Sequence, residues 1–349
     1  MEPGWSLYVS ALTVGILFGY VLQRGGFCLT RALANLVLSG DATILRAWIL
    51  ALVVAIIGVQ ALVSLHVVDV PVHSFRWLAN ILGGLLFGVG MILAGGCAGS
   101  TWYRVGEGAV GAVVVLLGFA IGASVVGIGA LAPVRRMLQE PTLTVGDAPP
   151  TLANALGVSP WIVIAGLALM AGPWFLRGRG GAAGGKWPWG VTGGAVGLLI
   201  IAGWWASSLG DGPQGITFSA NTGHLLTYVM VGFPNRMTWG MLLLPGVAVG
   251  AFAGAWLAGE FRWKLPPGWS LVKLFGGGLL MGGAALLGDG CNISHGLTNL
   301  ATLAVSSLVS FACMGLGGWA TLWALYLRAG ASERVRAASG AAPSGIPAP

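Results

Sequence analysis

The chain has 349 residues, of which 56% are hydrophobic, 8% are charged and 60 are glycine. So few charged side chains cannot cover a water-soluble surface, and the composition therefore predicts an integral membrane protein. The net charge of +7 comes from basic residues in loops between apolar runs and from no Lys/Arg tract, which excludes nucleic acid as a partner.

Long apolar stretches follow one another along the chain, each near the ~20 residues that span a bilayer. They cover about 6–23, 45–68, 78–95, 109–132, 157–176, 190–209, 238–259, 269–288 and 301–327. The first has no basic segment before it and no obvious cleavage site, which favours a retained helix over a signal peptide. We expect an all-α polytopic membrane protein with about nine transmembrane helices.

Four shorter segments between these stretches are each opened by a glycine-rich turn, at about 27–38, 98–106, 218–231 and 292–299. They are too short to cross, which predicts re-entrant half-helices. Irregular backbone at membrane depth is tolerated only where protein buries it or where it lines a cavity. The function is therefore expected at these interruptions. From residue 331 the tail is rich in Ala, Ser, Gly and Pro, and we expect it to be disordered.

The chain reads as two related halves. Gly83 to Cys97 matches Gly277 to Cys291 at 8 of 15 positions with an offset of 194, and an offset of 191 places Cys28 over Ser219. We expect one transport domain over 1–330, with repeats at about 5–133 and 190–327 and a linking helix at about 157–176.

Charge bias predicts the orientation. With the N-terminus outside, thirteen basic residues fall on the cytoplasmic side and four, Arg76, Arg135, Arg136 and Arg236, fall outside. An odd number of spans separates equivalent points, so the two halves are expected to be inverted, as in many secondary transporters.

Three cysteines carry the predicted chemistry: Cys28, Cys97 and Cys291 each follow a glycine-containing turn where a half-helix begins. Unpaired amides and the positive dipole end attract an anion there. A thiol is a weak donor and acceptor, which suits a soft ligand passed on through a path. Secondary candidates for substrate binding are Gly26, Gly96, Ser100, Ser219, Gly290, Ser294 and His295.

Other polar residues carry weaker signals. His295 could donate to an anion or relay a proton, or simply cap a helix, and Asp289 could gate the path or couple protons. Arg104 and Glu107 have the spacing of a local ion pair. His73 and Arg76 are expected to be solvated in an external loop, and Cys313 is expected to be a packing residue.

At the cysteine motifs the chain resembles the YeeE/YedE family of bacterial inner-membrane sulfur-transport proteins. The resemblance rests on Gly-Phe-Cys, Gly-Gly-Cys-Ala and Gly-Cys-Asn-Ile-Ser-His in this order, and it covers about residues 5 to 330. It implies uptake of thiosulfate, passed between Cys28, Cys97 and Cys291 without a stable covalent intermediate. It also implies a separate TusA-like cytoplasmic sulfur carrier as partner.

Alternatives stay open at the level of sequence. The substrate could be another sulfur or selenium species, and the protein could instead be a membrane thiol redox enzyme, a sulfurtransferase or a structural subunit. An enzyme of that kind needs a close cysteine pair or an activated nucleophile. The four cysteines show no Cys-x-x-Cys spacing, which argues against a redox pair or a zinc site. We therefore expect a transporter and no enzyme, with no metal and no cofactor.

Overall fold

A computed structural model describes residues 5–144, 149–176, 187–210, 212–231 and 237–327, and the predicted disordered tail lies outside them. These parts of the chain are helical and contain isolated β-bridges but no strand. In chain order the helices are α1 (Trp5–Gly25), α2 (Leu29–Ser39), α3 (Thr43–Ser64), α4 (Trp77–Leu93), α5 (Ala98–Gly106), α6 (Val110–Gly127), α7 (Ala132–Gln139), α8 (Leu152–Leu156), α9 (Pro160–Leu176), α10 (Trp189–Ser208), α11 (Ser219–Val231), α12 (Trp239–Leu257), α13 (Gly268–Leu287) and α14 (Val305–Leu322). Short turns of wider or tighter helix cover Ser294–Thr298, Leu300–Thr302 and Trp323–Leu327.

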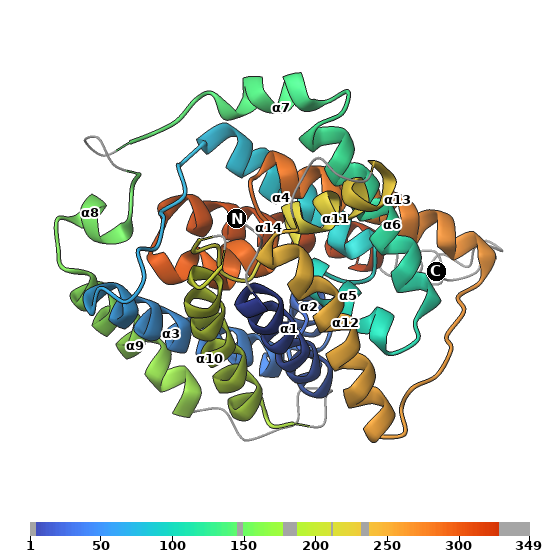
Figure 1. Ribbon diagram of the computed structural model, residues 1–349, viewed down its shortest axis with the longest axis horizontal. Helices are drawn as coiled ribbons and strands as arrows, with labels where there is room; N and C mark the ends of the chain where they lie inside the picture. The colour runs from blue at the N-terminus through green and yellow to red at the C-terminus, as the bar shows by residue number, and fades with distance from the viewer. Residues whose placement is uncertain (1–4, 145–148, 177–186, 211, 232–236, 328–349) are drawn as a thin grey trace, which may run out of the picture.

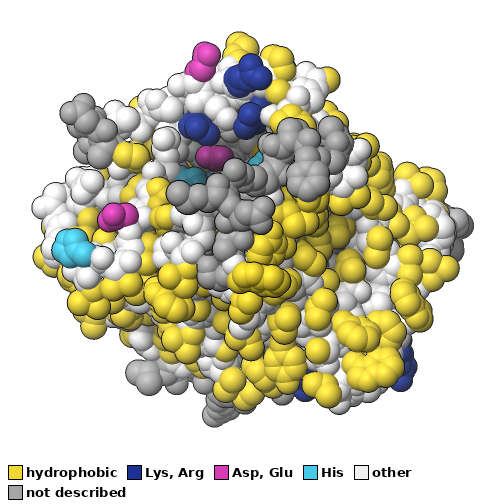
Figure 2. Space-filling view, in the orientation of Figure 1, with side chains coloured by type: hydrophobic (Ala, Val, Ile, Leu, Met, Phe, Trp, Pro, Cys, Tyr) yellow, Lys and Arg dark blue, Asp and Glu magenta, His cyan; other side chains and the backbone are white. Residues whose placement is uncertain are grey.

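Eight helices of the described chain are long and apolar enough to cross a membrane: α1, α3, α4, α6, α10, α12, α13 and α14. The ninth predicted span forms α9, which has 17 residues. At 1.5 Å per residue it is about 26 Å long, slightly shorter than a typical hydrocarbon core. The chain is thus an all-α polytopic membrane protein, and on the face shown in Figure 2 hydrophobic side chains gather in the lower and right parts, whereas charged side chains gather near the top.

The predicted half-helices are confirmed as short helices. Segments 27–38, 98–106 and 218–231 form α2, α5 and α11, and segment 292–299 contains the wide turn Ser294–Thr298. Figure 1 shows α2, α5 and α11 among the long helices, whereas α7 and α8 lie at the periphery. The interruptions of the apolar runs therefore meet inside the bundle.

The long helices pack in pairs that the predicted repeat would relate to each other. α1 packs on α12 as α10 packs on α3, and α4 packs on α14 as α13 packs on α6. Glycines make these contacts close: a side chain at Gly88 would collide with the Met314 carbonyl, and one at Gly282 with the Phe119 carbonyl. Small residues of this kind allow membrane helices to approach closely.

Candidate functional site

Two of the predicted cysteines stand at the first turn of a short helix. Cys28 is the N-cap of α2 and Cys97 is the N-cap of α5, both with extended backbone. Their carbonyls accept the first helical bonds, from Ala32 N at 3.0 Å and from Thr101 N at 2.9 Å. Each thiol thus lies beside the unpaired amides of a helix N-terminus.

The structure brings Cys28 and Cys97 together although 69 positions separate them in sequence (97 minus 28). The Cys28 thiol lies close to the Cys97 thiol and to the Ser100 hydroxyl. Ser100 Oγ also donates to the Cys97 carbonyl at 2.9 Å. Cysteines without Cys-x-x-Cys spacing can thus still lie close together, because sequence spacing does not report contacts between different half-helices.

Cys291 takes the corresponding place in the second half. Its thiol lies within reach of the backbone of Phe218, just before α11, and of Ser294. Cys28, Cys97 and Cys291 are 5%, 1% and 0% exposed, so all three thiols are shielded from bulk solvent.

A cavity of about 520 Å³, here called the Cys28 cavity, opens on one side of the cysteines. Gly26, Cys28 and Ser100 line it, together with Thr30, whose buried hydroxyl has no hydrogen-bond partner among the described residues. Its charged lining residues are Arg24, Arg31, Arg104, Lys264, Glu107 and Glu260. Four basic and two acidic groups make the cavity attractive to an anion.

A second cavity of about 120 Å³, here called the Ser219 cavity, is lined by Thr217, Ser219, Asp289 and Ser294. The repeat offset of 191 relates Thr217 and Ser219 to Gly26 and Cys28, and the offset of 194 relates Asp289 and Ser294 to Gly95 and Ser100. All four related residues line the Cys28 cavity. Residues that the predicted repeat alignment pairs therefore line two separate cavities. Cys97 and Cys291 line neither of them.

Glycine is required at the predicted site positions for two different structural reasons. Gly26 has a positive φ of 57°, which few other residues adopt. Gly96 and Gly290 are instead crowded: a Cβ at Gly96 would lie 2.8 Å from Ser100 Oγ, and one at Gly290 would lie 3.0 Å from Ser294 Oγ. The glycines keep the backbone close to the serine hydroxyls.

His295 is 1% exposed and has two protein partners. Its Nε2 lies 2.9 Å from the Gly288 carbonyl and its Nδ1 lies 3.1 Å from Ser307 Oγ. Because a carbonyl only accepts, Nε2 carries the hydrogen and donates to Gly288. His295 thus braces the turn before Cys291, and a role in substrate binding stays a prediction.

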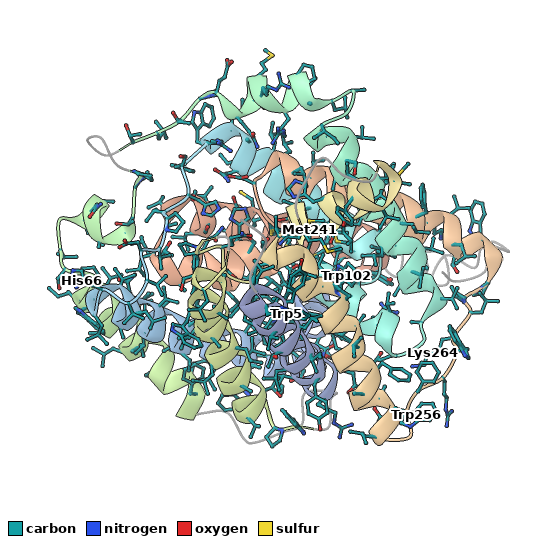
Figure 3. All side chains as sticks on the ribbon, viewed as in Figure 1. Trp5, His66, Trp102, Met241, Trp256 and Lys264 are labelled. Atoms are coloured by element: carbon teal, nitrogen blue, oxygen red, sulfur yellow. The ribbon has the colours of Figure 1, made fainter. Side chains whose placement is uncertain are left out.

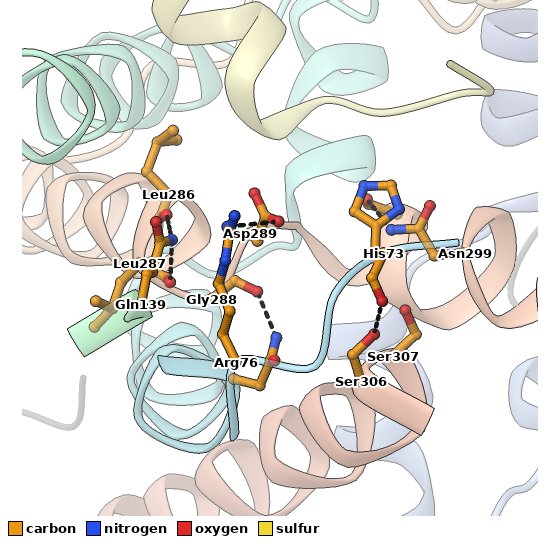
Figure 4. A network of polar contacts seen from close by, with 12 residues as sticks. His73, Arg76, Gln139, Leu286, Leu287, Gly288, Asp289, Asn299, Ser306 and Ser307 are labelled. Atoms are coloured by element: carbon orange, nitrogen blue, oxygen red, sulfur yellow. Dashed lines mark hydrogen bonds and ion pairs between the residues drawn. The ribbon is translucent and has the colours of Figure 1, made fainter. Parts of the chain in front are cut away.

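Sequence reasoning placed Arg76 and His73 in a solvated loop, which the structure corrects. Arg76 Nη1 lies 3.2 Å from Asp289 Oδ2, and His73 lines the Ser219 cavity (Figure 4). Asp289 has a left-handed φ of 65°, like the 64° of Gly95 at the equivalent turn. Only the repeat alignment, which put a carboxylate at a glycine position, signalled this site.

The predicted local ion pair between Arg104 and Glu107 is also corrected. Arg104 Nη1 donates to the Gly95 carbonyl at 2.9 Å, and Glu107 Oε1 accepts from Gln23 Nε2 at 3.2 Å. Arg104 thus contacts the turn before α5, Glu107 contacts the end of α1, and both residues line the Cys28 cavity.

Two further contacts complete the surroundings of the site. Trp102 of α5, central in Figure 3, donates from Nε1 to Thr222 Oγ1 of α11 at 3.1 Å, which ties the two short helices together. Cys313 is half-buried, and its Cβ packs against Gly84. That contact fits the expected packing role.

The fold and the site together define a multi-pass membrane protein with interrupted helices around a buried, thiol-containing centre. Residues 24–320 match the model of the sulphur transport family, and the chain belongs to this family. The resemblance seen in the cysteine motifs is thereby confirmed.

Named relatives extend over nearly the whole chain. It is 28% identical to the thiosulfate transporter TsuA of Escherichia coli over 96% of this chain and 99% of the relative. It is 31% identical to the thiosulfate transporter TsuA of Spirochaeta thermophila over 91% of this chain and 99% of the relative. A shorter match, 35% identical over 130 residues, is to the probable transporter YedE of Salmonella typhimurium.

Proposed function

We propose that this protein is a permease that takes up thiosulfate across the bacterial inner membrane. Family membership supports transport of a sulfur compound, and the two TsuA relatives, similar along almost their entire length, support thiosulfate as the substrate. The names of the family and of these relatives favour a transporter over an enzyme.

One observation supports the proposed path: three buried thiols lie at interrupted helices, and residues paired by the repeat alignment line two separate cavities near them. An anion that enters the Ser219 cavity meets Ser219 and Ser294 first, and Cys291 lies within reach of Ser294. Cys97 and Cys28 follow, and Cys28 faces the other cavity. The order Cys291, Cys97, Cys28 is therefore the proposed route inward.

The groups along the route suit the two ends of thiosulfate in different ways. Helix amides, serine hydroxyls and the glycine backbone suit the oxygens of thiosulfate, whereas a neutral thiol can contact its terminal sulfur through a weak S–H···S interaction. A thiolate would repel the anion. Weak contacts let the ion leave each site, which a conducting path requires, and no stable covalent intermediate is needed.

We also propose that the halves are inverted, with the N-terminus outside and the C-terminus in the cytoplasm. The basic residues that line the Cys28 cavity, Arg24, Arg31, Arg104 and Lys264, all belong to the set assigned to the cytoplasm. On the other side Arg76 pairs with Asp289, and α7, which carries Arg135 and Arg136, reaches the end of α13 through Gln139. The separation of the two sets supports this orientation and a single transport domain over 1–330.

A separate TusA-like sulfur carrier is the proposed cytoplasmic partner. The Cys28 cavity is the one that would face it, and its volume of about 520 Å³ can hold a small anion. Gly26, Gly96, Ser100, Ser219, Gly290, Ser294 and His295 remain the proposed substrate contacts beside the cysteines.

The adjacent Cys28 and Cys97 thiols favour one rival, a membrane thiol redox enzyme or sulfurtransferase. A transporter of another sulfur or selenium species is the second rival. Both give results different from a thiosulfate permease in an uptake assay, because an enzyme accumulates no substrate and a different permease prefers another ion.

The test is uptake of radiolabelled thiosulfate into proteoliposomes that contain only this protein. We expect accumulation with the unmodified chain and at least a tenfold loss with Cys97→Ala or Cys291→Ala at matched abundance. Cys313→Ala is the matched control, because this half-buried cysteine lies outside the route, and it should retain uptake. Accumulation in the Cys97→Ala or Cys291→Ala protein at the unmodified rate would refute the cysteine route.

A further inference from the structure

The Arg76–Asp289 ion pair lies at the edge of the Ser219 cavity. Arg76 Nη1 and Asp289 Oδ2 are 3.2 Å apart, and the two side chains are 31% and 41% exposed. Asp289 lines the cavity and Arg76 precedes α4, so the pair bridges the wall of the cavity and the loop before α4 (Figure 4). An ion that enters from this side passes close to both charges.

The backbone just before Arg76 is held by two hydrogen bonds from other parts of the chain. The His73 carbonyl accepts from Ser306 Oγ at 3.3 Å, and the Phe75 carbonyl accepts from Leu143 N at 2.8 Å. The guanidinium can therefore change partner by side-chain rotation while its backbone stays in place.

The turn itself does not need the Asp289 carboxylate. Gly95 makes the equivalent turn with almost the same φ, and glycine adopts this left-handed conformation at lower cost than aspartate. In that half Arg104 binds the Gly95 carbonyl, and no carboxylate stands at the turn. A carboxylate at this turn is thus found in the smaller of the two cavities, whereas the acidic groups of the Cys28 cavity, Glu107 and Glu260, lie away from the turn in sequence.

A carboxylate beside an anion route repels the substrate unless a cation offsets it. Arg76 offsets Asp289, and a guanidinium matches oxyanions with parallel N–H donors. Partly exposed ion pairs are weak, so an arriving oxyanion can compete with Asp289 for the guanidinium.

We propose that Arg76 is the first cationic contact of the substrate at the Ser219 cavity and that Asp289 holds it there until an anion displaces the carboxylate. Asp289 then acts as a competitor that lowers the affinity of the entrance and closes it when no anion is bound. This inference deepens the proposed transport function and rests on it for the identity of the anion.

Initial rates of thiosulfate uptake in cells distinguish this role from simple bracing. Arg76→Gln should raise KM about tenfold with little change in the maximal rate, and Arg76→Lys should raise it less. Asp289→Asn should lower KM two- to threefold, and in the double variant it should have no further effect. Both single changes break the same ion pair, so KM rising equally in both would overturn the inference in favour of bracing. An unchanged KM in Arg76→Gln would also overturn it.

A second measurement needs no thiosulfate. In a Ser219→Cys variant, the rate of labelling by the anionic reagent 2-sulfonatoethyl methanethiosulfonate is compared with that of its cationic trimethylammonium analogue, after subtraction of the parent chain. The anionic-to-cationic ratio should fall several-fold with Arg76→Gln and rise with Asp289→Asn. If the ratio follows this pattern while the unmodified chain takes up no thiosulfate, the entrance stands and the proposed substrate fails. If uptake occurs but the ratio stays constant, the inference fails and the function stands.

Discussion

The three buried cysteines differ from the serines beside them by carrying a sulfur atom in place of the hydroxyl oxygen. A hydroxyl is a stronger hydrogen-bond donor than a thiol but lacks its soft, polarisable sulfur. If thiol-to-sulfur contact moves the ion, Cys97→Ser and Cys291→Ser should reduce uptake nearly as far as alanine. Cys28→Ser should reduce uptake less, because Ser219 occupies the equivalent place in the other half. Radiotracer uptake with Cys313→Ser as control checks this, and full activity in both serine variants would show that a donor alone suffices.

The contact between Cys28 and Cys97 makes their redox state a decisive property of the site. A covalent step would require a thiolate to attack an anion in a buried centre, where charge repulsion is poorly screened. We expect intact-mass spectrometry after turnover to show neither a disulfide nor an added sulfur atom. A stoichiometric persulfide that disappears as thiosulfate is consumed would favour the sulfurtransferase.

His295 illustrates how a candidate ligand can serve the backbone instead. Replacing it with alanine removes the partner of the buried Ser307 hydroxyl, at about 1–3 kcal/mol for an unsatisfied buried group, whereas the Gly288 carbonyl keeps its hydrogen bond from Asn80 Nδ2. We expect His295→Ala to lower the thermal unfolding temperature in detergent. A higher KM without any thermal shift would instead assign His295 to the substrate.

At the scale of helices, glycine contacts set the distance between partners. Gly88 on α4 and Gly282 on α13 face the carbonyls of Met314 and Phe119, so an added methyl group forces each helix pair apart. Gly88→Ala and Gly282→Ala should each destabilise the protein by about 1–3 kcal/mol. Gly315→Ala is the control, because open space surrounds that position. Thermal unfolding of the three variants tests the idea, and an unshifted Gly88→Ala would contradict it.

Sequence pattern predicted the helices and their interruptions well, because apolar length and glycine-rich turns are local properties. It did not predict which interruptions meet. The Cys28–Cys97 contact and the Arg76–Asp289 pair join residues far apart in the chain, and only packing decides such contacts. The sequence also did not predict that Ser294–Thr298 forms a wide helical turn, because a single extra residue in a turn leaves no clear periodic signal.

For the whole molecule, α9 decides how the halves are related. Four long helices precede it and four follow it, so the halves are inverted only if α9 crosses the membrane. Its 17 residues are near the lower limit for a span, although the placement of equivalent linings in two separate cavities favours crossing.

A topology assay tests this directly with alkaline phosphatase, which is active only outside the cytoplasm. We expect activity when it is inserted between α7 and α8 and no activity when it is inserted between α9 and α10 or fused after Pro349. The physical reason is the excess of basic residues in the loops assigned to the cytoplasm. Fluorescent-protein fusions at the same sites, which fluoresce only in the cytoplasm, serve as the converse control. Equal phosphatase activity on both sides of α9 would mean that α9 does not cross, and the two halves would then be parallel, with both cavities facing the same compartment and no continuous route between them.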